Sequence, residues 1–285
     1  MDRMSRRGFL GTAGMAAGMG AVLPALGAGT AGAQTGETAI AVEKNVVFGK
    51  GGEMDLKLDI YKPPAGTEKR MATIHVHGGG FTGGSKDTLS ERILPFARRG
   101  YVAVAAQYRL AGQAKWPSQI DDVKSAIRWT RANAAMLGIN PDRIAIVGYS
   151  AGGLLALNAA GLQDPPVAAC AAFYAVTDEP SPILPEGLDA AARRATTPAT
   201  NISARFAPTV LFHGVADTTV PIESSQKFFQ MLREAKVTTE LHTYAGAPHI
   251  FDQVPAFAAA SALMFDLFVD RYVLNPRPFL PPRRG

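Results

Sequence analysis

Short apolar segments alternate along the chain with longer segments whose apolar residues recur at helical spacing. Two initial strands are expected at 45–48 and 55–61, because the second alternates apolar and polar residues. Further strands are expected in the apolar segments 72–76, 102–106, 144–147, 168–174, 209–213 and 239–244. Helices are expected between and after these strands, near 89–99, 120–137, 151–161, 222–235 and 256–272. This alternation predicts an α/β fold with a mostly parallel central sheet and helices on both faces.

A serine stands where one of these strands gives way to a helix. Ser150 lies in the run Gly-Tyr-Ser-Ala-Gly-Gly at 148–153, directly after an apolar strand segment. A strand, a sharp turn and a helix in this order place a hydroxyl at the apex, where it can attack a carbonyl carbon. Glycines flank the serine because the turn is strained and larger side chains would collide with neighbouring strands.

A serine hydroxyl needs a base that takes its proton, and the base needs an orienting carboxylate. On a strand-turn-helix serine these partners follow in the order Ser, Asp or Glu, His. Asp217 and His249 follow Ser150 in that order, each just after an expected strand. Because ligands bind at the carboxyl ends of strands in such sheets, the sequence predicts a catalytic triad there.

Three glycines at 78–80 follow the strand at 72–76 and can bring backbone N–H groups close to a ligand. The N–H groups of Gly79, Gly80 and Ala151 are the predicted oxyanion hole, the last at a helix N-terminus. Aromatic and aliphatic residues beside these loops are expected to line the substrate pocket, namely Phe81, Tyr149, Tyr174 and Ile250.

Each of these features has a plain structural interpretation when it is taken alone. In a chain with 29 glycines a Gly-x-Ser-x-Gly can arise by chance, and the glycine run can be a tight turn. An aspartate after a strand is most often a turn or cap residue, and a lone histidine is most often a surface residue. Their joint occurrence in the required order favours the catalytic interpretation.

The remaining histidines and the cysteine are expected to be structural. No pair among His75, His77, His213 and His242 has the spacing of metal ligands, so neither a metal nor another cofactor is expected. Cys170, the only cysteine, lies in an apolar strand segment and is expected to be buried and inert.

Residues 40–273 resemble the α/β-hydrolase family, in particular the esterases that carry His-Gly-Gly-Gly. Tyr149 precedes the serine where the hormone-sensitive-lipase-like group has Asp, and Ala-Gly-Gln at 111–113 replaces its Ala-Pro-Glu. The pattern is closer to feruloyl-esterase-like (BD-FAE-like) and kynurenine-formamidase-like relatives. The resemblance implies an ion pair of Arg109 with Asp121 or Asp122; a helix N-terminal carboxylate without a special partner is the alternative.

In this fold the stretch 178–206 often carries a lid. A small cap built from 182–185 and a short helix near 188–194 is one interpretation, and an ordinary surface excursion is the other.

The two ends of the chain differ from its body. A twin-arginine signal peptide is predicted at 1–33, because paired arginines precede a Gly/Ala-rich apolar run and a small-x-small cleavage site follows at 31–33. The expected partner is the Tat export machinery, and the expected location is periplasmic or secreted in a bacterium. A membrane anchor is the alternative, and no stable membrane insertion is expected after cleavage. Residues 34–274 are the expected catalytic domain, and the Pro/Arg-rich tail 275–285 is expected to be mobile. Because these ends account for the net charge of +5, no nucleic acid partner is expected.

These observations predict a serine carboxylic-ester hydrolase that works through an acyl-enzyme on short-chain acyl esters. The resemblance suggests small-molecule or carbohydrate esters, including acetyl or feruloyl esters of plant polysaccharide. A serine peptidase or amidase, including a formamidase-like enzyme, is the alternative. A non-catalytic binding module on the same fold is the remaining alternative.

Overall fold

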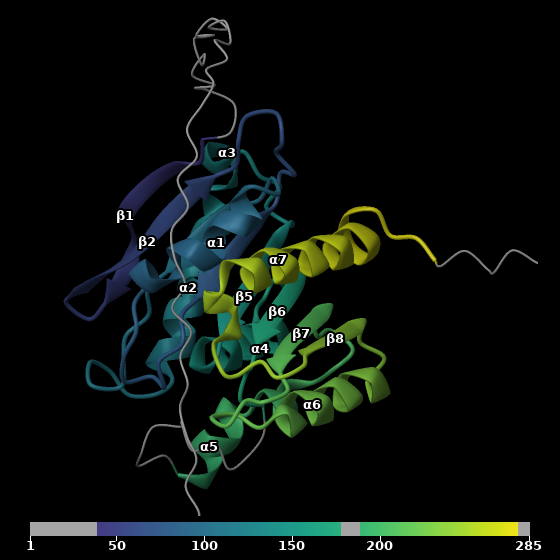
Figure 1. Ribbon diagram of the computed structural model, residues 1–285. Helices are drawn as coiled ribbons and strands as arrows, with labels where there is room; N and C mark the ends of the chain where they lie inside the picture. The colour runs from purple at the N-terminus through teal and green to yellow at the C-terminus, as the bar shows by residue number, and fades with distance from the viewer. Residues whose placement is uncertain (1–38, 178–188, 279–285) are drawn as a thin grey trace, which may run out of the picture. The chain divides into compact units, whose positions relative to one another are not determined.

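The computed structural model describes residues 39–177 and 189–278 (Figure 1). The predicted signal peptide, residues 182–185 of the predicted cap and the tail beyond residue 278 lie outside the described residues. The described residues belong to one compact unit.

The sheet has eight strands in the order β1-β2-β4-β3-β5-β6-β7-β8. Their bounds are β1 Ala41–Gly51, β2 Met54–Lys62, β3 Ala72–Val76, β4 Val102–Ala106, β5 Ile144–Tyr149, β6 Ala169–Phe173, β7 Thr209–Gly214 and β8 Thr239–Tyr244. β2 pairs antiparallel with β1 and β4, and the pairs from β4 to β8 are parallel. The predicted mostly parallel sheet is therefore confirmed.

The helices are α1 Ser90–Ala97, α2 Ser118–Ala132, α3 Ala134–Leu137, α4 Ala151–Leu162, α5 Ala190–Thr196, α6 Ile222–Glu234 and α7 Pro255–Val269. Short 3₁₀ turns occur at Lys86–Leu89, Pro198–Asn201 and Phe251–Gln253, and a π-helical turn at Asp270–Leu274 follows α7. The single helix expected at 120–137 is divided at Asn133, whose side-chain amide donates to the Trp129 carbonyl and competes with the helical backbone pattern. Among the described residues, none of the helices has the length and apolar character needed to cross a bilayer.

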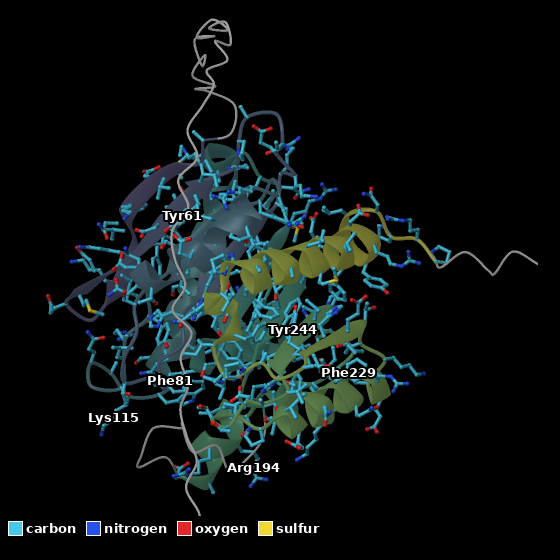
Figure 2. All side chains as sticks on the ribbon, in the orientation of Figure 1. Tyr61, Phe81, Lys115, Arg194, Phe229 and Tyr244 are labelled. Atoms are coloured by element: carbon cyan, nitrogen blue, oxygen red, sulfur yellow. The ribbon has the colours of Figure 1, made fainter. Side chains whose placement is uncertain are left out.

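Two apolar cores lie on the opposite faces of the sheet, and side chains fill both (Figure 2). Along β5, Ile144 and Ile146 enter the core shared with α2, α4 and α6, whereas Ala145 and Val147 enter the core shared with α1 and α7. This alternation follows from the two-residue period of a strand. Because β3 to β6 are buried along their whole length, their carboxyl ends are held rigidly at one edge.

An ion pair ties the loop after β4 to the N-terminal half of α2. The Arg109 guanidinium donates to both carboxylate oxygens of Asp122, over 2.8 and 2.7 Å, and its backbone N–H donates to the same group over 2.9 Å. Asp122 is buried, whereas its neighbour Asp121 is exposed. Of the two partners that the sequence left open for Arg109, the structure pairs it with Asp122.

The segment expected to form a cap is described from residue 189 onward. α5 begins two residues later than the short helix expected near 188–194, and its Arg194 is exposed (Figure 2). The buried Asn158 amide of α4 donates to the Thr196 carbonyl over 2.9 Å, so the end of α5 is held against α4.

Replacement of Asp122 by Ala is expected to lower the free energy of unfolding by about 2 kcal/mol, because a partly buried guanidinium loses its partner. Asp121→Ala, one residue away on the same helix, is the matched control and should change stability by about 0.5 kcal/mol or less. Urea unfolding of the three proteins measures both effects, and equal losses in the two variants would contradict the assignment.

Candidate active site

Ser150 occupies the turn between β5 and α4 in a conformation that non-glycine residues seldom adopt, with φ 52° and ψ −117°. Its backbone N–H donates to the Phe173 carbonyl at the end of β6 over 2.9 Å, which holds the turn against the sheet. A Cβ on Gly148 would collide with the Gly152 carbonyl, and one on Gly152 with the Val76 carbonyl of β3. The glycines therefore permit the close approach that lifts the Ser150 hydroxyl out of the sheet.

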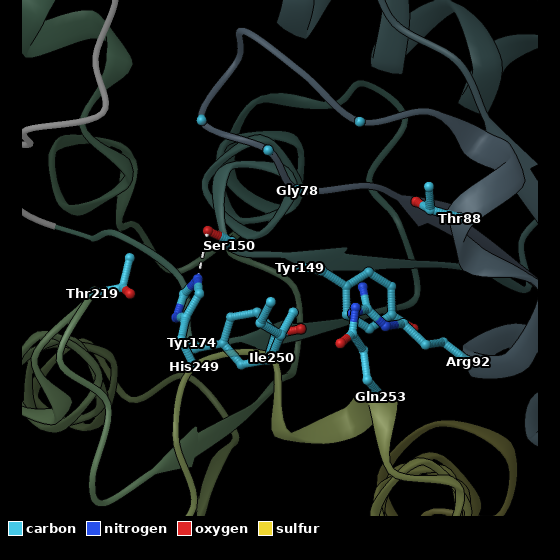
Figure 3. A pocket seen from close by; sticks show the side chains of 13 residues that line it. Gly78, Thr88, Arg92, Tyr149, Ser150, Tyr174, Thr219, His249, Ile250 and Gln253 are labelled. Atoms are coloured by element: carbon cyan, nitrogen blue, oxygen red, sulfur yellow. Dashed lines mark hydrogen bonds between the residues drawn. The ribbon is translucent and has the colours of Figure 1, made fainter.

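His249 and Asp217 lie beside this hydroxyl. The imidazole Nε2 of His249 is 3.0 Å from Ser150 Oγ (Figure 3), and its Nδ1 is 2.6 Å from Asp217 Oδ2. Since a carboxylate only accepts, Nδ1 carries the proton and Nε2 presents a lone pair to the serine hydroxyl. The structure thus brings together the three side chains that the sequence predicted as a triad, although 99 positions separate Ser150 from His249.

The Asp217 carboxylate is fixed by its own loop after β7. Its Oδ1 accepts the backbone N–H groups of Thr219 and Val220 over 2.8 and 2.9 Å. The buried His213 donates from Nε2 to the Val220 carbonyl over 2.9 Å, and this nitrogen lies 3.2 Å from Asp217 Oδ2. These contacts leave Oδ2 aimed at His249, and they give His213 a structural place beside the triad.

The glycine loop after β3 lies across from the hydroxyl. Gly79 and Gly80 have φ values of 113° and 60°. Within the described part of the chain their N–H groups donate to no protein acceptor, and both residues line the same cavity as Ser150. Ala151 is the first residue of α4, where the helix offers its N–H no internal acceptor. Gly79 and Gly80, whose N–H groups are unpaired among the described residues, therefore line the cavity at the serine where the oxyanion hole was predicted, whereas Ala151 is buried and does not line it.

His77 and Tyr108 support the glycine loop from behind. His77 donates from Nδ1 to the Gly78 carbonyl over 2.8 Å, and its ring stacks on Tyr108 with centroids 4.3 Å apart. The Tyr108 hydroxyl donates to the His77 carbonyl over 3.1 Å. Burial lowers the pKa of His77, which keeps the ring neutral and suited to this role.

A cavity of about 400 Å³ opens at the serine. Three of the four residues predicted to line it do so, namely Tyr149, Tyr174 and Ile250. Six more lining residues were not predicted, namely the glycines Gly78 and Gly84 and the residues Thr88, Arg92, Thr219 and Gln253. Thr219 could have been found from its place two residues after Asp217, whereas nothing in the helical segment around Arg92 signals a pocket.

Phe81 does not line this cavity. Its ring is buried in the core and meets the Tyr108 ring edge-on, with centroids 6.4 Å apart. The residue follows the glycine run with a φ of 63°, and this turn directs the chain away from the site and its side chain inward. The expectation that Phe81 lines the pocket is therefore wrong.

Behind the cavity the buried Asp252 carboxylate joins two of the lining residues, Tyr174 and Arg92. The Tyr174 hydroxyl donates to Asp252 Oδ1 over 2.5 Å, and Arg92 Nε lies 3.1 Å from Asp252 Oδ2. The edge of the Tyr174 ring meets the His249 ring, with centroids 4.5 Å apart. Burial raises the pKa of Asp252, and it raises the pKa values of Tyr149 and Tyr174 well above the ordinary value of a phenol. Both tyrosines therefore remain protonated donors.

The cysteine and the metal-ligating side chains offer no second site among the described residues. Cys170 is fully buried, and burial raises the pKa of its thiol. Within residues 39–177 and 189–278, no group of three or more His, Cys, Asp or Glu side chains could hold a metal ion.

His75 stands behind Tyr149, where it bonds the Tyr149 hydroxyl over 3.1 Å and the Thr73 hydroxyl over 3.0 Å. Burial lowers its pKa from 6.5 to about 3. As the pH falls below 6.5, the imidazole of His75 binds a proton in the unfolded chain, whereas in the folded protein it stays neutral until about pH 3. The stability that the neutral His75 contributes is therefore complete above pH 6.5 and is lost as the pH falls to about 3.

In both proteins the free energy of unfolding should fall between pH 6 and pH 4, but the fall should be less steep in His75→Gln. The slope of the variant should be smaller than that of the wild type by up to about 1.4 kcal/mol per pH unit. Urea unfolding across this pH range gives the slope, which does not depend on the absolute stability of the variant. Parallel slopes for the two proteins would contradict a buried neutral imidazole.

Comparison with known proteins gives three kinds of similarity. Residues 58–175 match the BD-FAE protein family. The chain is 30% identical over 267 residues to the probable carboxylic ester hydrolase LipM of Mycobacterium tuberculosis, a match that covers 80% of this chain and 61% of LipM. It is 35% identical over 162 residues to carboxylesterase NlhH of the same species, covering 53% and 49% of the two chains.

Among solved structures, the chain resembles the thermophilic esterase Est2 of Thermogutta terrifontis. The propionate-bound form has a TM-score of 0.70 and 32% sequence identity, over 80% of this chain and 93% of that chain. The chain spans 61% of the length of the curated relative LipM and 49% of the length of NlhH.

Proposed function

This chain belongs to the α/β-hydrolase family of esterases, and we propose that it hydrolyses carboxylic esters through Ser150 and an acyl-enzyme. The observation that carries the proposal is the hydrogen-bonded series Ser150 Oγ, His249 Nε2, His249 Nδ1 and Asp217 Oδ2. The free N–H groups beside the hydroxyl support it further.

In the first half of the reaction, His249 Nε2 takes the proton of Ser150 Oγ as this oxygen attacks the ester carbonyl carbon. The resulting oxyanion accepts hydrogen bonds from the N–H groups of Gly79, Gly80 and Ala151. Asp217 stabilises the imidazolium, which then gives its proton to the leaving alcohol. In the second half, His249 activates a water that attacks the acyl-enzyme, and Ser150 receives its proton back.

Similar proteins support both the nucleophile and the size of the acyl group. Structures of Est2 from T. terrifontis are described as bound to propionate and to butyrate, and as phosphorylated by paraoxon. Short-chain acyl esters are accordingly the proposed substrates of this chain, which has a cavity of about 400 Å³ at the serine. The similarity to the BD-FAE family supports acetyl or feruloyl esters of carbohydrate as the natural class.

We also propose that residues 1–33 direct export by the twin-arginine route, and that residues 34–274 form the catalytic domain of a periplasmic or secreted enzyme. The paired arginines at positions 6 and 7 and the small residues at 31–33 support this assignment.

Ser150→Ala and His249→Gln are each expected to lower kcat on 4-nitrophenyl acetate by at least about 10³-fold, because the nucleophile and its base act as one unit. Ser203→Ala, an exposed serine outside the cavity, is the matched control and should keep wild-type activity. Paraoxon should add one diethylphosphoryl group to the wild type and none to Ser150→Ala, as measured by intact mass. Equal ester turnover by wild type and Ser150→Ala would overturn the mechanism.

A series of 4-nitrophenyl esters from acetate to decanoate tests the acyl length. The kcat/KM is expected to be highest for acyl groups of two to four carbons. It should be about tenfold lower or more for an acyl group of ten carbons, because longer acyl groups do not fit in the cavity. An aryl acetamide serves as the amide comparison. Turnover of the amide without turnover of any ester would favour the amidase or peptidase alternative, and a rate that rises steadily to decanoate would contradict the short-acyl assignment.

A further inference from the structure

Arg92 is an arginine in the wall of the active-site cavity. It lies on α1, only 7% exposed, and it lines the same cavity as Ser150 and Tyr149. The centre of its guanidinium is 5.1 Å from the centroid of the Tyr149 ring, and the side chain reaches from α1 toward Tyr149 and Gln253 (Figure 3). Burial of an arginine is costly, so the positions of its donors show what it is placed to bind.

Asp252 pairs with only one side of the guanidinium. Arg92 Nε lies 3.1 Å from Asp252 Oδ2, and the other oxygen of this carboxylate, Oδ1, accepts the Tyr174 hydroxyl. Neither Nη atom of Arg92 donates a hydrogen bond to a residue that the structure describes. A buried arginine normally has its donors satisfied, so the end formed by the two Nη atoms is open for an acceptor in the cavity.

Apart from Asp252, which contacts Nε, the cavity around this open end has no carboxylate among its described lining residues. Among the described residues that line the cavity, Arg92 is the only Lys or Arg, and none is Asp or Glu. Thr88 and Gln253 also line it and can donate from a hydroxyl and an amide. The cavity wall therefore offers a cation and neutral donors, a combination that suits an anionic oxygen group.

We propose that Arg92 binds a carboxylate on the ester substrate, so that the enzyme prefers esters that carry a carboxylate in their acyl or alcohol part. The proposal rests on the ester hydrolysis proposed above. The two Nη atoms form one edge of a planar fork, which matches the two oxygens of a carboxylate, and lysine lacks this geometry. Asp252 and Tyr174 fix the fork from the opposite side, so the substrate meets a guanidinium that is already oriented.

Two matched pairs of substrates test the preference. The acyl-borne pair is mono-4-nitrophenyl glutarate and the 4-nitrophenyl ester of glutaramic acid. The alcohol-borne pair is 3-acetoxybenzoate and 3-acetoxybenzamide. In each pair a carboxylate is compared with a neutral amide of nearly the same shape. The ratio of kcat/KM values, charged over neutral, should exceed one in the wild type for at least one pair.

Arg92→Gln should lower that ratio about tenfold or more, and Arg92→Lys should fall between this variant and the wild type. Arg98→Gln makes the same charge change at an exposed arginine directly after α1 and outside the cavity, so it should keep the wild-type ratio. Because Arg92→Gln leaves Asp252 without its cation, the double variant Arg92→Gln/Asp252→Asn removes both charges together and should show the same loss of preference.

Binding of glutarate to Ser150→Ala, measured by isothermal titration calorimetry, provides a readout that does not depend on turnover. Glutarate should bind this variant, and Arg92→Gln introduced into it should weaken the binding about tenfold.

The outcomes separate the two proposals. Ratios that do not change in Arg92→Gln and in the double variant, together with Ser150-dependent turnover of the neutral esters, would overturn the role of Arg92 and leave ester hydrolysis intact. Glutarate binding that is absent or insensitive to Arg92 would also overturn it. Loss of ester hydrolysis altogether, with Arg92-dependent glutarate binding, would instead overturn the proposed function and keep the carboxylate site.

Discussion

The close approach of the Ser150 turn to β3 is the constraint on which the site depends. α4 begins directly after Ser150, and at Gly152 it passes so near the Val76 carbonyl that any side chain there would collide with β3. The same contact places the glycine loop after β3 beside the hydroxyl, because Gly78 lies against the Tyr149 carbonyl and the Ser150 Cβ. Nucleophile and N–H donors are thus positioned together by one packing contact between main chains.

Much of this arrangement follows from local patterns in the sequence. The strands expected at 72–76, 102–106 and 239–244 coincide with β3, β4 and β8, and for β3 and β4 the reason is a short apolar run that ends at polar or turn residues. Residues at the carboxyl ends of parallel strands meet at one edge, so Ser150, Asp217 and His249 could be grouped by topology alone. Their catalytic role remains a prediction that the kinetic variants test.

The features that the sequence could not give depend on side-chain direction and on distant packing. Phe81 follows a glycine with a positive φ, and only the backbone path shows that its ring turns into the core. Arg92 and Asp252 are 160 positions apart in segments that read as an ordinary amphipathic helix and a short loop. Their meeting requires α1 and the loop before α7 to pack on the same face of the sheet, and no local signal encodes that contact.

Asp252 connects the base of the triad to the far wall of the cavity. Through Oδ1 it holds Tyr174, whose ring edge supports the His249 imidazole, and through Oδ2 it holds Arg92. The ring that contacts His249, the proposed general base, and the arginine proposed to bind the substrate therefore share one buried carboxylate. Residues joined in this way do not contribute independently to stability or activity. The free-energy effects of substitutions at Arg92 and at Tyr174 should therefore not be additive. The proposed substrate contact at Arg92 and the orientation of the His249 ring therefore lie at two ends of the same polar network.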